Sequence, residues 1–210
     1  MTRLLLVGAT GLVGRAVLNK ALSDARIDRV VAPTRRPLAV HPKLVNPVVD
    51  FARLSGNEDW AADAVICTLG TTRAKAGSAA AFRAVDYDLT LAVARIAKQR
   101  GATCFVLTSS MGANAKSPFL YMRTKGEIEH ALTALAFSSL TIVRPGMIGG
   151  DRDEFRGSER LASVVLRIAA PILPGYYLSP ATAIADALIE AAIAGQPGCH
   201  LIKADRLTGA

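Results

Sequence analysis

The chain has 210 residues, of which 51% are apolar and 5% are aromatic, and its formal net charge is +8. This length suffices for one well-cored domain, and abundant alanine beside few aromatic residues favours helix–sheet packing over a β-sandwich. The basic residues form no long block and no run interleaved with aromatic residues. The composition therefore argues against a nucleic-acid-binding protein, despite the positive charge.

The cysteines and the N-terminal stretch indicate the compartment. Cys67, Cys104 and Cys199 show no metal-ligand spacing, and their odd number does not suit a disulfide framework, so we expect reduced thiols and no metal. The opening MTRLLLVGATGLVG resembles a signal peptide, but glycines interrupt its apolar run and no small-residue cleavage site follows. No apolar stretch is long enough to span a membrane. We therefore expect a cytoplasmic protein that does not associate with a membrane.

Apolar runs typical of strands alternate with longer helical patterns along the chain. Strands are expected at residues 4–7, 30–33, 44–50, 64–69, 104–109 and 140–144, and helices at 11–23, 79–100, 120–137, near 159–170 and at 180–194. A polar loop, GGDRDEFRGSE, follows the last strand, and a short apolar tail lies around 200–202. Strands that are apolar on both faces and separated by helices predict an α/β fold, a three-layer doubly wound parallel sheet. We expect a single domain over 1–210, with 147–210 forming a small helical region on the substrate side.

The first expected strand runs directly into VGATGLVG, a loop that opens the first helix. In such a loop Gly8 allows a tight turn, Gly11 lets a pyrophosphate approach the backbone, and Gly14 lets the helix pack closely on the strand. The helix N-terminus then faces the anion. The pattern predicts a dinucleotide site of the Rossmann type; the alternative is a tight turn without a ligand.

The residues after the second and third strands bear on the choice of cofactor. About twenty residues beyond the glycine loop, a domain that binds NAD carries an acidic residue for the ribose 2′-hydroxyl. This chain has APTRRP there, so Arg35 and Arg36 are expected to bind a 2′-phosphate, which predicts NADP(H). The alternative is a pair of solvated arginines. Asp50 either accepts a hydrogen bond from the adenine amino group or caps the segment that follows it.

The ends of the fourth and fifth strands should lie beside the same ligand, because the carboxyl ends of parallel strands line the crevice. The residues expected there are Leu69, Gly70, Thr71, Thr108, Ser109 and Ser110. Arg73 and Lys75 follow the fourth strand in an exposed loop, where they either bind an anionic substrate or are simply solvated. This edge of the sheet is therefore the expected site of cofactor and substrate.

Tyr121 and Lys125 lie four residues apart in LYMRTKGEIEH, so they share one face of the expected helix. Such a pair is common and indicates little by itself. Its place after a strand that ends in serine hydroxyls changes this, since Ser110 and the helix can converge on one ligand. In this combination the Tyr–Lys pair becomes a candidate for a functional role beside the ligand.

The ordered motifs GATGLVG, TRR, LGTTRAKAG, VDYD, TSSMGAN, FLYMRTKGEIE and RPGMIGGDR resemble the short-chain dehydrogenase/reductase superfamily over nearly the whole chain. Within it, LGTTR with FLY and KGE is similar to an atypical branch that includes the Tat-interacting oxidoreductase-like proteins. The resemblance implies an NADP(H)-dependent oxidoreductase that reduces a carbonyl or oxidises an alcohol. Its substrate would be a small molecule, and the protein would be a monomer or a homodimer.

The resemblance also implies a role for each matched residue. Ser110, or otherwise Ser109, would polarise the substrate carbonyl, and Tyr121 would donate the proton. Lys125 would bond the nicotinamide ribose and favour the phenolate form of the tyrosine. The remaining residues that would hold the cofactor are Gly8, Thr10, Gly11, Leu12, Val13, Gly14, Arg35, Arg36, Asp50, Arg144, Pro145, Gly146 and Met147.

Two departures from the superfamily pattern keep other functions open. CTLGTTR stands where typical members have an Asn-Ala-Gly signature, and residues 79–100 lack the asparagine that organises a proton-relay water. A cofactor-sensing interaction module without turnover is therefore an alternative, and a sugar-nucleotide epimerase-like enzyme is a minor one. Tyr176 and Tyr177 either line the substrate pocket or pack within a loop.

Overall fold

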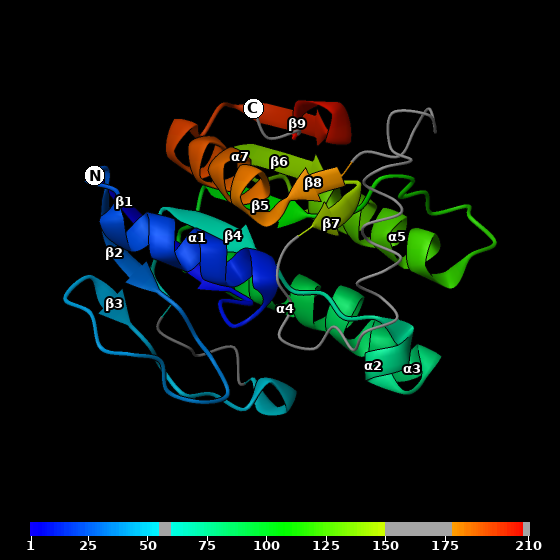
Figure 1. Cartoon of the computed structure of the whole chain (residues 1–210), viewed down its shortest axis with the longest axis horizontal. Helices are drawn as coiled ribbons and strands as arrows, with labels where there is room; N and C mark the ends of the chain where they lie inside the picture. The colour runs from blue at the N-terminus through cyan, green and yellow to red at the C-terminus, as the bar shows by residue number, and fades with distance from the viewer. Residues whose placement is uncertain (55–59, 150–177, 208–210) are drawn as a thin grey trace.

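A computed structural model describes residues 1–54, 60–149 and 178–207 (Figure 1). The strands of its main sheet are β1 (Thr2–Val7), β2 (Ile27–Val31), β3 (Leu44–Val45), β4 (Ala64–Cys67), β5 (Cys104–Thr108), β6 (Ser139–Arg144) and β9 (Gly198–Lys203). Within the described residues these seven strands are all parallel, in the order β3-β2-β1-β4-β5-β6-β9. A separate short pair joins β7 (Met147–Gly149) to β8 (Leu178–Pro180).

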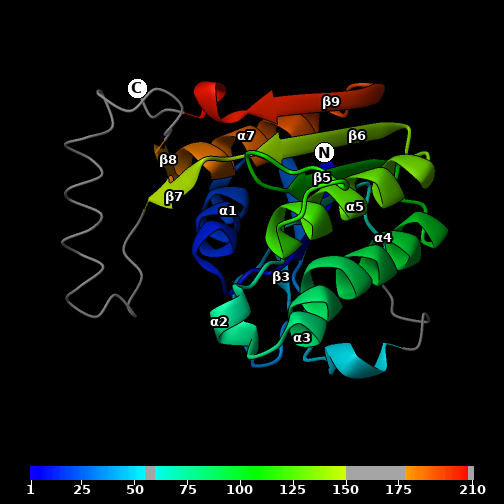
Figure 2. The same ribbon diagram turned by 90° about the vertical axis from the view of Figure 1, so that its right-hand side faces the viewer.

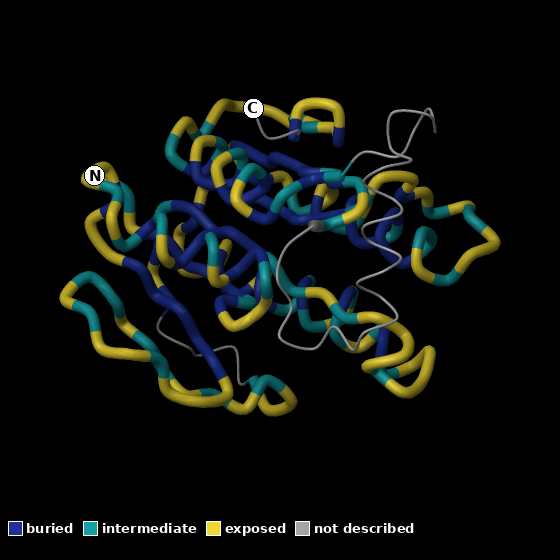
Figure 3. The backbone as a smooth tube through the Cα atoms, viewed as in Figure 1, coloured by how far each residue is buried: buried dark blue, intermediate teal, exposed yellow. Residues whose placement is uncertain are grey.

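Helices cover both faces of the sheet (Figure 2). Helices α1 (Leu12–Ser23) and α7 (Ala181–Ala194) pack on one face, and α4 (Thr90–Gln99) and α5 (Leu120–Ala134) pack on the other. The alternation of side chains along a strand explains the two cores. Leu4 and Leu6 of β1 enter the first core, whereas Leu5 and Val7 enter the second. The structure confirms the expected three-layer α/β fold, with the central strands β1, β4, β5 and β6 largely buried (Figure 3).

The strand order reverses between β1 and β4, which lie side by side at the centre of the sheet. Strands β2 and β3 extend the sheet on one side of β1, and β4, β5 and β6 extend it on the other side. In open α/β sheets such a reversal leaves a crevice outside the carboxyl ends of the strands. The candidate site therefore lies where β1, β4, β5 and β6 end.

The expected third strand, 44–50, is reduced to β3 by Asn46 and Pro47. The Asn46 side-chain amide donates to Ala32 O at 2.5 Å and to Thr34 Oγ1 at 2.8 Å. Just after β2, a side-chain donor therefore stands where a strand would offer a backbone N–H. Pro47 has no N–H to continue the ladder. Pairing resumes only as an isolated bridge between Thr34 and Val48. The strand prediction was thus correct in place and too long.

The expected helix 79–100 is divided into α3 (Ala79–Arg83), a π-helical segment η2 (Ala84–Leu89) and α4. A π-turn is rare and widens the helix locally. Thr90 partly satisfies the disturbed backbone, since its hydroxyl donates to Val85 O at 3.3 Å. The wide turn carries Asp86, whose side chain is buried.

The C-terminal part differs most from expectation. The apolar tail around 200–202 is the edge strand β9, paired with β6 over six residues. A short 3-10 helix, η3 (Ala204–Arg206), follows it. The helix expected near 159–170, the polar loop from 150 onward, and Tyr176 and Tyr177 lie outside the described residues. None of the helices in the described ranges is long and apolar enough to cross a membrane.

Candidate functional site

The loop from β1 into α1 is shaped by its glycines. Gly8 has a φ of +92°, and a Cβ there would lie 2.6 Å from Thr68 Oγ1. A Cβ on Gly14 would lie 2.0 Å from Gly8 O. Close packing of loop, helix and β4 therefore requires glycine at both positions. Gly11 is different, because it is exposed and a Cβ there would meet only Gly8 O, at 3.4 Å. Gly11 is where the loop is open to a ligand.

The N-terminus of α1 is prepared for an anion. No side chain caps it, and its first turn contains no acidic residue. The first N–H groups of a helix, here those of Leu12, Val13 and Gly14, have no intrahelical acceptor. Thr10 is exposed on the loop just before them. This arrangement fits a phosphate, which helix N–H groups and the helix dipole attract together.

Arg35 and Arg36 lie exposed in a bend just after β2. Thr34 fixes this bend, because its hydroxyl donates to Arg36 O at 2.6 Å. Neither guanidinium makes an ion pair or hydrogen bond with the side chains of the described residues. Both arginines are therefore free to meet an anion at the end of β2.

Asp50 does not end a strand, because β3 stops at Val45. Its Oδ1 accepts from Ala52 N at 3.0 Å, which caps the 3-10 helix η1 (Phe51–Arg53). Its Oδ2 lies 3.7 Å from Arg53 Nε in an exposed ion pair. The capping alternative is thus realised in the structure. Adenine binding by this carboxylate stays a prediction.

The chain after β4 lies against a buried ion pair. Thr71 N donates to Asp86 Oδ2 at 2.8 Å. A Cβ on Gly70 would lie 3.5 Å from Asp86 Oδ1 and 3.6 Å from Lys125 Nζ. Leu69, Gly70 and Thr71 therefore link the sheet edge to this ion pair, and a Cβ on Gly70 would make ordinary van der Waals contact with it.

The segment with Arg73 and Lys75 is a single helical turn rather than the expected open loop. Helix α2 (Arg73–Ala76) begins after Thr72, whose hydroxyl accepts from Lys75 N at 3.2 Å. It ends at Gly77, which has a φ of +80°. The cap and the left-handed glycine explain why this turn forms.

The two serines after β5 have different environments. Ser109 is buried, and its hydroxyl donates to Glu129 Oε1 at 2.5 Å. Ser110 is half-buried, and its hydroxyl donates to Met111 O at 3.3 Å. Thr108 is buried in the strand, and its hydroxyl has no partner among the described residues. Ser110 is therefore the hydroxyl of this strand end that is open to a substrate, while Ser109 supports the core.

Tyr121 and Lys125 lie in the first turns of α5. Tyr121 is 40% exposed, and its ring lies 5.8 Å from that of Phe82 between centroids. The side chain of Lys125 is only 5% exposed, and its Nζ lies 2.8 Å from Asp86 Oδ1. The loop after Ser110 is fixed on the same helix, because Asn114 N donates to Met122 O at 3.0 Å. The structure thus brings the serine loop and the Tyr–Lys helix into contact.

The pKa of Lys125 results from two opposed effects. Burial by itself lowers it, because a charged amine is poorly solvated inside the protein. The attraction of Asp86, with a smaller one from Tyr121, outweighs burial and raises the pKa above its usual value. Lys125 is therefore a charged ammonium at neutral pH, although it is almost fully buried.

Arg144, at the end of β6, is held by a second charged pair. Its Nε donates to Glu129 Oε1 at 2.9 Å and its Nη2 to Glu129 Oε2 at 2.5 Å. The hydrogen bonds and charge of Glu129 outweigh partial burial and raise the pKa of Arg144. After Arg144, Pro145 O accepts from Met111 N at 2.8 Å, and Gly146 N donates to Ser179 Oγ at 3.1 Å. These bonds fix the segment that leads to Met147, which is 42% exposed.

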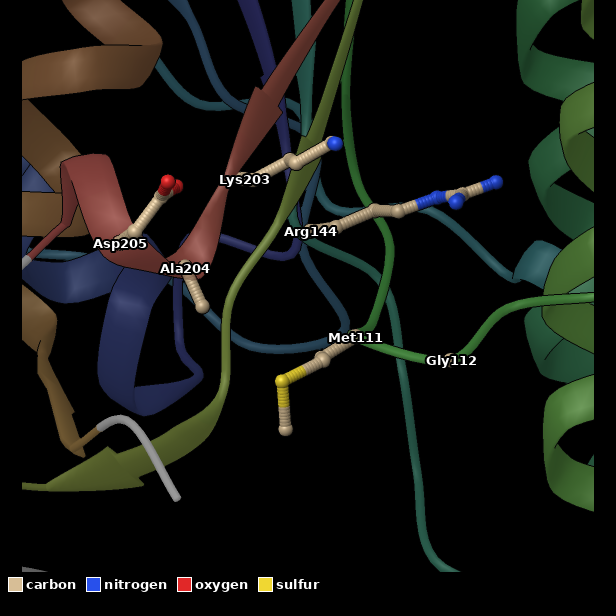
Figure 4. Close-up of a pocket in the computed structure, with 6 residues that line it drawn as sticks. All are labelled: Met111, Gly112, Arg144, Lys203, Ala204 and Asp205. Carbon is tan, nitrogen blue, oxygen red and sulfur yellow. The ribbon is translucent and has the colours of Figure 1, made fainter. Parts of the chain in front are cut away.

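A cavity of about 330 Å³ opens beside this segment (Figure 4). The described residues that line it are Met111, Gly112, Arg144, Lys203, Ala204 and Asp205. Arg144 and Lys203 are neighbours in register on β6 and β9, and Figure 4 shows both extending to the same side, with Asp205 on the other side of β9. The cavity begins one residue beyond Ser110. Ser110, Tyr121 and Lys125 are not among the residues that line it.

Asp86 and Glu129 are two buried carboxylates beside the candidate site that the sequence did not reveal. Each is a carboxylate on the buried face of a helix and each pairs with a predicted site residue. A signal was present: Asp86 lies four residues from both Phe82 and Thr90, and all three are buried. Glu129 likewise lies between Ile128 and Leu132 on the buried face of α5. A charge inside an apolar stripe indicates a buried partner.

The fold is of the Rossmann type, and solved structures of NAD-binding proteins share it. It is similar to MoeE5 in complex with UDP-glucose and NAD, with a TM-score of 0.73 and 18% identity over 96% of this chain and 75% of that one. A short-chain dehydrogenase family protein from Francisella tularensis subsp. tularensis SCHU S4 matches with a TM-score of 0.66 and 14% identity, covering 98% of each chain. These low identities show the fold alone.

The chain belongs to the HIM1 family, whose model matches residues 60–166. It is 40% identical over 163 residues to "Protein FMP52, mitochondrial" of Candida albicans, and this alignment covers 72% of this chain and 69% of that protein. It is also 40% identical over 170 residues to the protein of the same name from Lodderomyces elongisporus, covering 73% and 70%.

The predicted cytoplasmic location is wrong. Relatives from several fungi, among them Candida albicans and Coccidioides immitis, are named mitochondrial proteins. The prediction rested on excluding a secretory signal and a membrane span, which does not distinguish the cytoplasm from other reducing compartments.

Proposed function

We propose that the protein is an NADP(H)-dependent oxidoreductase that reduces a carbonyl or oxidises an alcohol. The observation that carries this proposal is the common location of an open hydroxyl at Ser110, an accessible phenol at Tyr121 and a buried, charged Lys125 at one sheet edge. The narrower likeness to the Tat-interacting branch is part of the same proposal. So is a single nucleotide-binding domain in which residues 147–210 supply the substrate side; the lining of the cavity by Lys203, Ala204 and Asp205 supports this.

The residues at the sheet edge fit a nicotinamide dinucleotide. The uncapped N-terminus of α1 and the open backbone at Gly11 would hold the pyrophosphate, and Arg35 and Arg36 would hold a 2′-phosphate. The backbone at Leu69, Gly70 and Thr71, with that from Pro145 to Met147, would border the remainder. The structural neighbours whose titles name NAD support a nicotinamide cofactor. The two free arginines favour the phosphorylated form.

The protein's own groups would manage the proton. The Ser110 hydroxyl would donate a hydrogen bond to the substrate oxygen and polarise the carbonyl. Tyr121 would deliver a proton to that oxygen as negative charge develops there, and the Lys125 ammonium would stabilise the phenolate that remains. A bound nicotinamide supplies or accepts the hydride, which is the difficult part of the reaction. The cavity lined by Arg144 and Met111 would admit a small substrate rather than a large one.

Turnover by wild type and by Tyr121→Phe tests this function. Both proteins are saturated with NADPH and mixed with a panel of aldehydes, ketones and quinones, and loss of reduced nicotinamide absorbance is followed. We expect wild type to consume NADPH with at least one compound class and Tyr121→Phe to lose about 100- to 10,000-fold in rate. NADPH affinity should change little, because the ring of Tyr121 is retained.

Two results would contradict the proposal. Consumption that survives in Tyr121→Phe would remove the tyrosine from the chemistry. NADPH binding without consumption of any compound in the panel would favour the sensor, a module in which the cofactor shifts a conformational equilibrium that a partner recognises.

A further inference from the structure

Asp86 is a buried carboxylate to which the proposed chemistry gives no role. Its side chain is 0% exposed, beside a Lys125 side chain that is 5% exposed. Asp86 Oδ1 lies 2.8 Å from Lys125 Nζ, and Asp86 Oδ2 accepts from Thr71 N at 2.8 Å. One carboxylate thus joins the end of β4, the π-helical segment η2 and helix α5.

The position of Asp86 depends on the π-helical turn. Among the described helices only η2 has this form, and π-turns are frequent at functional sites. The wide turn is stabilised where it meets α4, by the Thr90 hydroxyl on Val85 O. An isolated buried charge is strongly destabilising unless it is paired. The helix is therefore distorted at the residue that neutralises Lys125.

We propose that Asp86 is a positioning residue that holds Lys125 charged and fixed at the site. The inference rests on the proposed function, in which Lys125 acts on Tyr121 and on the cofactor ribose. Asp86 itself touches neither substrate nor cofactor and acts through the ammonium. Asp86 lies in the helical segment that lacks the relay asparagine of typical short-chain dehydrogenases, and from there it stabilises Lys125 on α5. Through Thr71 it also fixes the loop that would border the cofactor.

Asp86→Asn is the matched variant, because it keeps the size of the side chain and an acceptor for Thr71 N while removing the charge. The groups that face Lys125 are Asp86 from η2, Cys67 from β4 and Tyr121 from α5 itself. Burial raises the pKa of the Cys67 thiol, so this group stays neutral near pH 7. In Asp86→Asn the main effect that opposes burial is removed, so the pKa of Lys125 should fall.

The direct readout is the titration of Lys125 by NMR in protein with ¹³C-labelled lysine, assigned with Lys125→Met. Wild type without cofactor should show a Lys125 pKa above the usual ~10.4 of a free lysine. Asp86→Asn should show one well below it. A wild-type pKa below the usual value, or no change on going to Asp86→Asn, would overturn the proposal. The wild-type arm decides even if the variant does not fold.

Stability against pH gives an independent readout. In wild type the folded pKa of Lys125 is raised, so its contribution is present at neutral pH and is lost only as pH rises through that pKa. In Asp86→Asn the folded pKa is depressed, so the urea midpoint should rise between pH 7 and about pH 10 relative to wild type. The rise should disappear in Asp86→Asn/Lys125→Met, where neither charge remains. A rise that persists there would place the effect elsewhere.

Activity separates positioning from a structural role. The proposal holds if two results agree. Lys125 must titrate as expected, and as pH rises Asp86→Asn must lose NADPH affinity or turnover at a lower pH than wild type does. If the titration shifts but the pH profiles of binding and turnover match wild type, Asp86 is structural only and the proposal fails. Absence of turnover in wild type would refute the proposed function instead, and the Lys125 titration and NADPH affinity would still test Asp86.

Discussion

At the scale of single residues, the charged side chains near the site fall into two kinds. Lys125, Asp86 and Glu129 are buried and paired, whereas Arg35 and Arg36 are exposed. Breaking a buried pair is costly, because it leaves an uncompensated charge in a poorly solvated place. The buried charges therefore maintain the geometry of the site, and the exposed arginines remain available for a ligand.

Replacing both arginines, in Arg35→Ala/Arg36→Ala, should change cofactor preference. Two charge-assisted hydrogen bonds to a 2′-phosphate would be lost, so NADPH should bind roughly 10- to 100-fold more weakly. NADH has no such phosphate, and its affinity should stay within about twofold of wild type. Fluorescence titration with both cofactors measures this. The thermal unfolding midpoint is the control, since both side chains are exposed. An equal loss for both cofactors would refute the 2′-phosphate assignment.

The candidate ligand-binding residues are easier to predict from sequence than the buried residues that position their side chains. Glycines after a strand and a Tyr–Lys pair are readable from spacing, and the structure places Gly11, Ser110 and Tyr121 at one edge. Asp86 pairs with Lys125, which is 39 positions further along the chain (125 − 86), so only the folded structure reveals its partner. The choice between Ser109 and Ser110 likewise depends on Glu129, which is distant in sequence.

At the scale of elements, the contact between α5 and the loop after Ser110 is very close. A Cβ on Gly126 would lie 2.1 Å from Ala115 N and 2.3 Å from Asn114 C. These are backbone atoms, which cannot move aside as a side-chain tip can. The glycine in the KGE motif thus fixes the separation of the loop and the helix.

Gly126→Ala should therefore destabilise the protein, although alanine normally favours a helix by about 0.5 to 1 kcal/mol over glycine. Overpacking against the backbone should cost roughly 1 to 3 kcal/mol, measured as the free energy of unfolding in urea. The loop that carries Ser110 must also shift, so turnover should fall with it. A variant more stable than wild type would show that the loop yields, and that the contact does not position the serine.

The boundaries of helices and strands agree with the predicted ranges where an apolar run defines the element. Helices α1 and α5 and strands β1, β4, β5 and β6 lie close to their predicted ranges. The failures have local causes. Asn46 and Pro47 shorten β3, the buried Asp86 coincides with a π-turn inside a predicted helix, and β9 is a mostly exposed edge strand without a long apolar run.

At the scale of the whole molecule, the order of strands creates the site. The reversal between β1 and β4 brings the glycine loop, the chain after β4 and the serine loop to one edge, although they are far apart in sequence. The repeated alternation of apolar runs and helices made this fold predictable. Cellular location is not encoded in that alternation, and the names of the fungal relatives corrected it.

The central claim is that this edge binds a nicotinamide dinucleotide through the loop at Gly11, and Gly11→Ala tests it most directly. The added methyl group meets only Gly8 O, at 3.4 Å, so the thermal unfolding midpoint should equal that of wild type. It would occupy the space of the pyrophosphate, so NADPH, titrated by its fluorescence, should bind at least about tenfold more weakly. Equal NADPH affinity in the two proteins, or no NADPH binding by wild type, would contradict the account.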